Sequence, residues 1–170
     1  MRWALNAALC AVTAASSAAQ AQPGLDPFLQ RLLAAHNRER AAVGVPPLTW
    51  DPILAASARS YGPTLEAIGR LQHSPRASRP GQRENLWMGT KGYFTPEQMI
   101  GSWSAEKRFY RPGLFPGVST TGNWIDVAHY TQMVWRTTTR VGCGLYRGVR
   151  MDWLICRYSP PGNVDNKPVF

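Results

Sequence analysis

Three histidines occur among the 170 residues of this chain, and their surroundings give the first indication of chemistry. His129 stands in the segment HYTQMVW, whose other residues are typical of a buried helical turn, and it shares a helix face with Met133. His73 lies in LQHS, where it closes the second helical region. An imidazole at such a position binds a metal, transfers a proton or satisfies a buried neighbour. The rest of the sequence has to decide among these three roles.

Two carboxylates pose a matching problem. Glu106 shares a helical stripe with Met99, Trp103 and Tyr110, so the pattern places an acid on a face that apolar residues bury. Burying an unpaired carboxylate costs on the order of several kcal/mol unless it gains a cation, a hydrogen-bond donor or a proton. A basic side chain from another segment would satisfy it. Glu84 opens the short apolar segment ENLWMG.

If the fold brings His73, Glu84, Glu106 and His129 together, they form a set suited to a divalent metal such as zinc. Neutral imidazoles would be ligands, and the carboxylates would be ligands or would orient the rings. Spacing alone does not establish this site, because the chain has no HExxH and no CxxC pair. A GxSxG elbow and a glycine-rich phosphate loop are also absent, which argues against a serine nucleophile and a nucleotide site.

Start and stop signals divide the chain into four helical regions. Asp26 and Pro27 start the first, and Gly44 ends it, with His36 on its inner face as a histidine that bonds neighbouring backbone. A second alanine-rich region after Asp51 and Pro52 must kink or split at Gly62 and Pro63. The two remaining regions are one that starts at a capping box of Thr95 and Gln98, and one over 127–135.

The first 21 residues resemble a secretory leader. One arginine precedes an apolar run, and Ala19, Gln20 and Ala21 form a small-residue cleavage site. An uncleaved membrane anchor is the alternative. Cleavage would leave 170 − 21 = 149 residues, 22–170, the size of one domain. We therefore expect a secreted or periplasmic protein.

Removal of the leader deletes Cys10 and leaves Cys143 and Cys156 in an oxidising compartment. Each cysteine lies in one of two short β-runs that flank a turn near Gly148. A hairpin centred there sets Cys143 opposite Cys156 and Tyr146 opposite Trp153. Directly opposite residues have Cβ atoms about 4.5–5.5 Å apart, so little adjustment is needed for a bond. We expect a Cys143–Cys156 disulfide.

The full chain carries a formal charge of +9, and loss of Arg2 leaves 18 basic against 10 acidic residues, or +8. Such a surplus favours anionic partners. Outside the cytoplasm these are envelope lipids, acidic polysaccharides or proteins and not a specific nucleic acid. The charge also fits the simpler role of keeping a secreted protein soluble.

Helices before, between and around a terminal hairpin indicate an α+β domain on a small antiparallel sheet. Several segments resemble the CAP superfamily of cysteine-rich secretory proteins, antigen 5 and group-one pathogenesis-related proteins. The resemblance covers about residues 29 to 163 and is carried by HNRERAAVGVPPLTWDPILAASARSYG, LQHS, RENLWMG, HYTQMVWRTTTRVGCG and ICRYSPPGNV.

The resemblance implies a three-layer α-β-α sandwich with a central antiparallel sheet and a wide cleft. In that family two histidines and two glutamates line the cleft, which by motif correspond to His73, Glu84, Glu106 and His129. Plant-type members have further cysteines before HYTQ, whereas this chain reads STTGNWIDVA, so that loop is expected to be either mobile or held by Trp124.

These features favour a secreted, non-enzymatic module that binds a divalent metal, such as zinc, and an envelope or host ligand. Relatives are described as binding sterols or other lipids, and WMGTKGYF is an apolar loop suited to them unless its aromatic residues cap the core. The alternative is a zinc-dependent hydrolase with Glu84 or Glu106 as general base. A third reading is a structural interaction domain whose tetrad is a hydrogen-bond network. The oligomeric state is left open.

Overall fold

The computed structural model describes residues 24–170, so the expected leader, 1–21, lies outside the described residues. Within 24–170 no helix is both long enough and apolar enough to cross a bilayer. The α-helices are α1 Pro27–Ala42, α2 Pro52–Arg59, α3 Gly62–Ile68, α4 Pro96–Ser104 and α5 Ala128–Val134. The strands are β1 Thr49–Trp50, β2 Arg83–Thr90, β3 Arg140–Arg147 and β4 Met151–Ser159. Short 3-10 turns are η1 Arg76–Ser78, η2 Ala105–Phe109 and η3 Trp124–Val127.

The four strands form one sheet in the order β1-β3-β4-β2. The three long strands are antiparallel, as expected, whereas the two-residue β1 runs parallel to β3 and makes the sheet mixed. The parallel pairing sets Thr49 beside Arg140 and Trp50 beside Val141. The backbone N–H of Asp51 extends it by one bond to the carbonyl of Val141.

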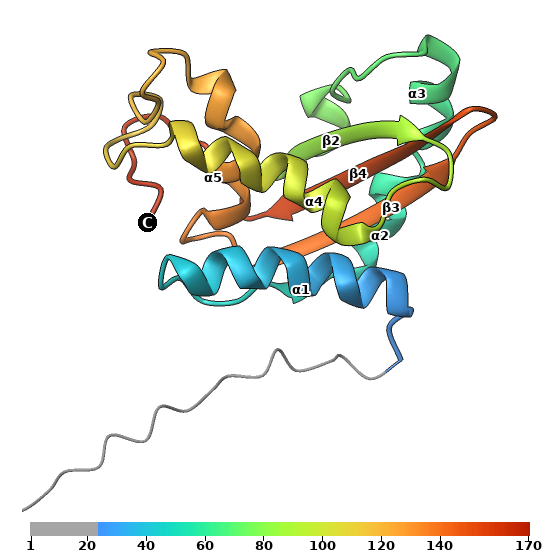
Figure 1. Ribbon diagram of the computed structural model, residues 1–170, viewed down its shortest axis with the longest axis horizontal. Coiled ribbons are helices and arrows are strands. Elements are labelled where there is room, and N and C mark those ends of the chain that lie inside the picture. Colours follow the sequence, from blue (N-terminus) through green and yellow to red (C-terminus); the bar gives the residue numbers. More distant parts are fainter. Residues whose placement is uncertain (1–23) are drawn as a thin grey trace, which may run out of the picture.

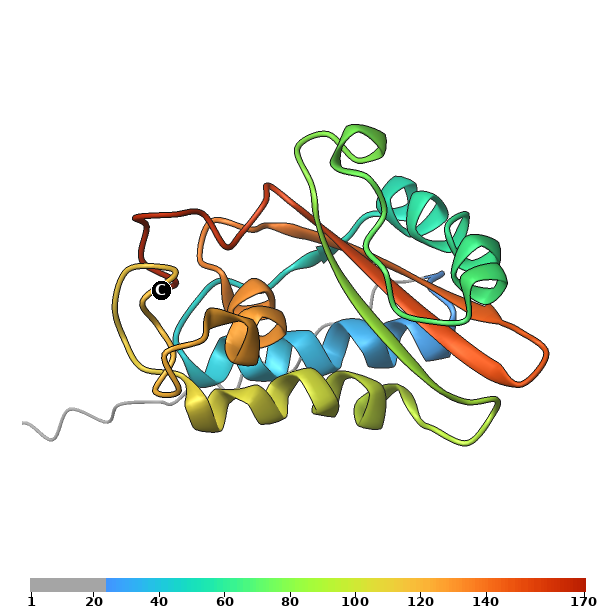
Figure 2. The same ribbon diagram turned by 90° about the horizontal axis from the view of Figure 1, so that it is seen from above.

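Helices cover both faces of this sheet. Figure 2 shows α1 and α4 on one side of the strands and α2 and α3 on the other. The helix α5 packs with α1 and α4 beside the start of β2, and α2 packs across β3 and β4 (Figure 1). The predicted three-layer α-β-α arrangement is confirmed.

The predicted hairpin is present in the expected register. Cys143 pairs with Cys156 and Tyr146 with Trp153, and the two cysteines are joined by a disulfide. Both cysteines are buried within the main hydrophobic cluster. The bond therefore links β3 to β4 in the middle of the sheet.

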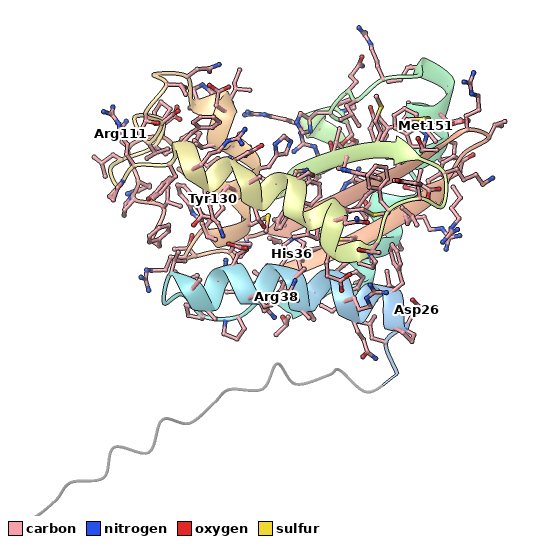
Figure 3. All side chains as sticks on the ribbon, in the orientation of Figure 1. Asp26, His36, Arg38, Arg111, Tyr130 and Met151 are labelled. Carbon is pink, nitrogen blue, oxygen red and sulfur yellow. A yellow bond between two sulfur atoms is a disulfide. The ribbon has the colours of Figure 1, made fainter. Side chains whose placement is uncertain are left out.

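The first helix is capped at its start and bonded to the sheet through His36. Asp26 accepts bonds from the N–H groups of Phe28 and Leu29, as its predicted capping role requires. His36 points from α1 toward the sheet (Figure 3) and bonds the carbonyl of Leu32 through Nδ1 and the Tyr158 hydroxyl through Nε2. The predicted backbone bond is therefore confirmed, with Tyr158 as a second partner.

Arg40, on the same face of α1, is fully buried and donates to four carbonyls. These belong to Pro46, Met133, Trp135 and Thr138. Burial lowers its pKa to about 10, which still leaves the guanidinium charged at neutral pH. A cation at the carboxyl end of α5 is stabilising there, so Arg40 fixes the helix that carries His129.

Two expected helix ends are wrong. The second helical region splits into α2 and α3, as its Gly-Pro pair predicted, but α3 ends at Ile68 because Gly69 adopts a left-handed conformation. His73 therefore lies in a loop beyond the helix. The third helix ends at Ser104, and Glu106 belongs to the tighter turn η2, so Tyr110 no longer continues the helical stripe.

Candidate functional site

A cleft of about 830 Å³ opens beside the start of β2, between the loop that follows α3 and the segment that contains η3 and α5. Figure 1 shows these two segments on either side of the first residues of β2. His73, Glu84 and His129 line the cleft. Glu106 lies behind His129, in contact with its ring. The four residues highlighted by the sequence thus come from four separate segments to one place.

His73 and Glu84 form the first pair. The loop places Nδ1 of His73 3.0 Å from Oε1 of Glu84, and the ring remains 55% exposed. The Glu84 side chain has no exposed surface. Its two oxygens accept from the backbone N–H and the hydroxyl of Ser74 and from the guanidinium of Arg157. Glu84 is thus held rigidly, and it fixes the ring of His73.

The charge of Glu84 is retained in spite of its burial. Burial alone would raise the pKa of this carboxyl. Hydrogen bonds from His73 and Ser74 and the positive charge of Arg79 outweigh that effect, so the net pKa is below its usual value. Glu84 is therefore a buried anion whose two oxygens accept hydrogen bonds from His73, Ser74 and Arg157.

Glu106 and His129 form the second pair. Oε1 of Glu106 lies 2.6 Å from Nδ1 of His129. Its Oε2 accepts from the backbone N–H groups of His129 and Tyr130, in the first turn of α5. These amides have no partner within their own helix, and a carboxylate is favoured at that end of the helix dipole. The acid that the sequence marked as costly to bury is thus satisfied by a histidine and a helix end.

Stacking also fixes the His129 ring. It lies nearly parallel to the indole of Trp103, with an angle of 7° and ring centroids 5.9 Å apart. The indole itself donates to the carbonyl of Leu86 in β2. The backbone carbonyl of His129 accepts from Asn85, the neighbour of Glu84. The second histidine is therefore held from three directions.

Both imidazoles use Nδ1 for a carboxylate. Because a carboxylate only accepts, Nδ1 carries the proton when the ring is neutral, and Nε2 carries a lone pair. Within residues 24–170 no protein group bonds Nε2 of either His73 or His129. A carboxylate behind a histidine that presents its second nitrogen is the arrangement of many zinc ligands. The donor set thus fits a divalent metal with two protein ligands.

The tetrad is an open set and not a closed metal cage. In the described part of the chain, the three-member group of such side chains with ligand atoms within 4.8 Å of one another is His36 with Cys143 and Cys156. That group is not a metal site, because its cysteines are bonded to each other. A metal at His73 and His129 would take its remaining ligands from water or a bound molecule.

Comparisons with known proteins show the family to which the chain belongs. The family model described as CAP, the cysteine-rich secretory protein family, matches residues 33–158. The chain belongs to the CAP family. A pathogenesis-related protein of PR-1 type from Sambucus nigra is 40% identical over 130 residues, which cover 76% of this chain and 74% of that protein. Pathogenesis-related protein 1C of Nicotiana tabacum is 39% identical over 143 residues, covering 83% and 80% respectively.

The predicted family membership is thereby confirmed, and CAP and PR-1 proteins are typically secreted. A solved structure described as the crystal structure of NaASP2 with Zn2+ aligns with a TM-score of 0.72 and covers 87% of both chains. At 24% identity this likeness shows the CAP fold alone. The four tetrad residues all lie within the segment that the family model matches.

Several residues of the CAP cleft were missed from the sequence. Arg157 and Ser74 hold Glu84, and Asn85 bridges the carbonyl of His129 to the Tyr158 hydroxyl. The arginines at 76, 79 and 83 line one wall. A signal for this wall exists, since residues 67–83 include four arginines and no acid. The pairing of Arg157 with Glu84, in contrast, depends on strand register.

Trp124 packs edge-on against Phe115, with ring centroids 5.4 Å apart. This contact agrees with the expectation that Trp124 holds the loop before HYTQ. The residues of the segment WMGTKGYF differ in their exposure. Trp87 is buried and packs on Phe94, whereas Met88 and Tyr93 are exposed. Part of WMGTKGYF therefore caps the core, and part faces outward.

Proposed function

We propose that the protein is an exported CAP module whose cleft holds a divalent metal, in the first place zinc, between Nε2 of His73 and Nε2 of His129. The observation that carries the proposal is that both rings bond a glutamate through Nδ1 and, among residues 24–170, leave Nε2 without a protein partner at an open cleft. The zinc named for NaASP2, which shares this fold, supports it. When bound, the metal would supply a Lewis-acidic point for an anionic or carbonyl ligand.

Within this proposal the two glutamates orient the rings and are not ligands. Glu84 is enclosed and surrounded by donors, and Glu106 has both oxygens occupied by N–H groups. The same facts weaken the zinc-hydrolase alternative, which needs one of them as general base. A base must reach the proton that it removes. We therefore favour a binding module over an enzyme.

Calorimetric titration with zinc at neutral pH tests the metal site. The mature, disulfide-bonded protein should bind about one equivalent, while His73→Ala and His129→Ala should each lose most of the affinity, because two protein ligands are few for zinc. Arg70→Gln is the matched control, since Arg70 is exposed and, within the described part of the chain, its side chain bonds Gln72 alone. Near-ultraviolet dichroism checks that each variant is folded. Equal heats in all four proteins would refute the metal site.

The ligand that the module carries outside the cell is the second part of the proposal. Met88 and Tyr93 expose 40% and 74% of their surface and offer an apolar contact for a sterol or other lipid. Tyr93→Ser should lower lipid transfer between vesicles, with Ile53→Ser, equally exposed on α2, as control. Phe94 is a poorer choice because it packs on the core residue Trp87. Unchanged transfer by Tyr93→Ser would count against this contact.

The proposal that the protein is exported is based on the predicted leader at 1–21 and on the fact that CAP family members are typically secreted. Expression of the full chain, followed by N-terminal sequencing of the exported protein, should give a terminus at Gln22. Recovery of the intact chain from the membrane fraction would instead support the uncleaved anchor.

A further inference from the structure

One wall of the cleft has more positive charge than its acids neutralise. Arg76, Arg79 and Arg83 line it, and the acids of the lining are Glu84 and Asp165. Glu84 is already shared, since Arg79 lies 3.9 Å and Arg157 3.4 Å from its oxygens. The negative charge of Glu84 therefore compensates Arg79 and Arg157 and does not neutralise the remaining arginines.

Arg76 and Arg83 are the arginines that remain. Within residues 24–170 no carboxylate lies within 4.0 Å of either guanidinium. Arg83 makes one long bond of 3.5 Å to the carbonyl of Asn163. Burial and then the nearby charges of Arg76 and Arg79 lower the pKa of Arg83, while Asp165 opposes them. A bound anion would relieve this repulsion between cations.

The opposite wall is apolar. Trp124 and Ile125, at the start of η3, expose 42% and 58% of their surface. Val164, which exposes 37% and also lines the cleft, follows Asn163, whose carbonyl accepts from Arg83, so it lies next to the arginine wall. Trp124 is held in place by the buried ring of Phe115. The cleft volume of about 830 Å³ lies in the range of small-molecule sites, about 300–1,000 Å³. A ligand that fills the cleft would thus meet arginines on one side and apolar side chains on the other.

From these two walls we propose that the cleft binds single-chain amphiphiles with an anionic head group. The head group, a carboxylate, sulfate or phosphate, bonds Arg76 and Arg83, and the alkyl chain lies along Trp124, Ile125 and Val164. A hydrophilic anion would leave the apolar side chains exposed to water, and a neutral lipid would leave the two arginines without an anionic partner. The inference rests on the proposed function, because it assigns a ligand class to the same cleft, but it uses neither histidine.

Titration with decyl phosphate, below its micelle concentration and with EDTA present, tests the head-group contact. Arg76→Gln and Arg83→Gln should each weaken binding at least about tenfold, the lower end of what a charge-assisted hydrogen bond contributes. Arg70→Gln should bind as the parent does, because Arg70 is outside the cleft lining. Asp165→Asn should strengthen binding about twofold, because it removes the negative charge that faces the head group.

The apolar wall has its own matched pair. Ile125→Ser should weaken decyl phosphate binding about fivefold through lost apolar contact, whereas Ile53→Ser should leave it unchanged. Ile53 is 79% exposed, but it lies on α2, outside the cleft. Inorganic phosphate tests the head group alone and decyl maltoside the chain alone. Each should bind at least about tenfold more weakly than decyl phosphate.

The outcomes separate the two proposals. The amphiphile site is overturned if inorganic phosphate or decyl maltoside binds as tightly as decyl phosphate, or if Arg70→Gln weakens binding as much as Arg83→Gln. It is also overturned if the parent binds zinc but not decyl phosphate. If decyl phosphate binds with the expected arginine dependence while zinc does not bind, the metal proposal fails and the amphiphile site stands.

Discussion

At the scale of single residues, the two His–Glu pairs differ in how deeply the acid lies. Glu84 has no exposed surface and is held between Arg79 and Arg157, whereas the Glu106 side chain is 19% exposed and rests on a helix end. Breaking a buried ion pair from one side leaves the partner charges without compensation. Glu84 therefore stabilises the fold as well as orienting the His73 ring, whereas Glu106 mainly orients the His129 ring.

Glu84→Gln should lower the free energy of unfolding by about 3 kcal/mol, because it leaves Arg79 and Arg157 as buried cations without their anion. Urea unfolding followed by tryptophan fluorescence measures this. Glu39→Gln is the control, since its pair with Lys107 lies at the surface, with the lysine 56% exposed, and its removal should cost less than about 1 kcal/mol. A loss for Glu84→Gln no larger than that of Glu39→Gln would show that the cluster is not stabilising.

His36 predicts a pH dependence of stability. Burial, and then the charge of Arg40, lower its pKa from 6.5 to about 4, although the bond to Leu32 opposes them, and Tyr158 is the titratable group facing it from β4. Below about pH 6.5 the unfolded imidazole takes up a proton that the folded one accepts only below about pH 4. Stability is therefore complete above 6.5 and falls as the pH drops toward 4, by about 3 kcal/mol in all.

The measurement is the free energy of unfolding in urea at several values between pH 7.5 and 4.5, for the parent and for His36→Gln. The variant should be less stable at pH 7.5 but should show a flatter slope across this window. Parallel slopes in the two proteins would mean that His36 does not titrate as its burial requires.

At the scale of elements, two glycines in β3 allow α2 to lie directly on the sheet. A Cβ at Gly142 would come within 2.3 Å of the backbone nitrogen of Ala55, and one at Gly144 within 2.5 Å of the Cα of Arg59. Both neighbours are backbone atoms, which cannot rotate away. The helix and the strand would have to separate.

Gly144→Ala should therefore destabilise the protein by at least about 2 kcal/mol, the scale of an overpacked core. Gly101→Ala is the matched control with the opposite sign. Gly101 lies inside α4 with nothing within 4 Å of its Cβ position, so alanine should stabilise by about 0.5–1 kcal/mol. Thermal unfolding of the two variants beside the parent checks both signs. Similar shifts in the same direction would contradict the packing argument.

Elements with local signals could be predicted from the sequence. Asp26 and the box of Thr95 and Gln98 cap their helices in the expected way, and the hairpin register placed Cys143 opposite Cys156. The predicted ends of α3 and α4 were wrong. Gly69 is a local stop signal that the expected helix end at His73 passed over, whereas no periodicity within the segment reveals the change to the tight turn η2 after Ser104.

At the scale of the whole molecule, the cleft depends on the convergence of four segments. The loop after α3, the strand β2, the turn η2 and the helix α5 each supply one member of the tetrad. Nothing in their spacing along the chain required them to meet, so only the resemblance to the CAP family grouped them. The arginine wall could be predicted only in part. The sequence shows the positive charge of the loop but not which residues face it across the cleft.

The most direct test of the central claim is anomalous diffraction at the zinc edge from crystals soaked in zinc at neutral pH. We predict one peak in the cleft, about 2.0–2.1 Å from Nε2 of both His73 and His129, with Glu84 and Glu106 still bonded to Nδ1. A cleft without a peak, or a peak that touches only one ring, would contradict the proposed metal centre.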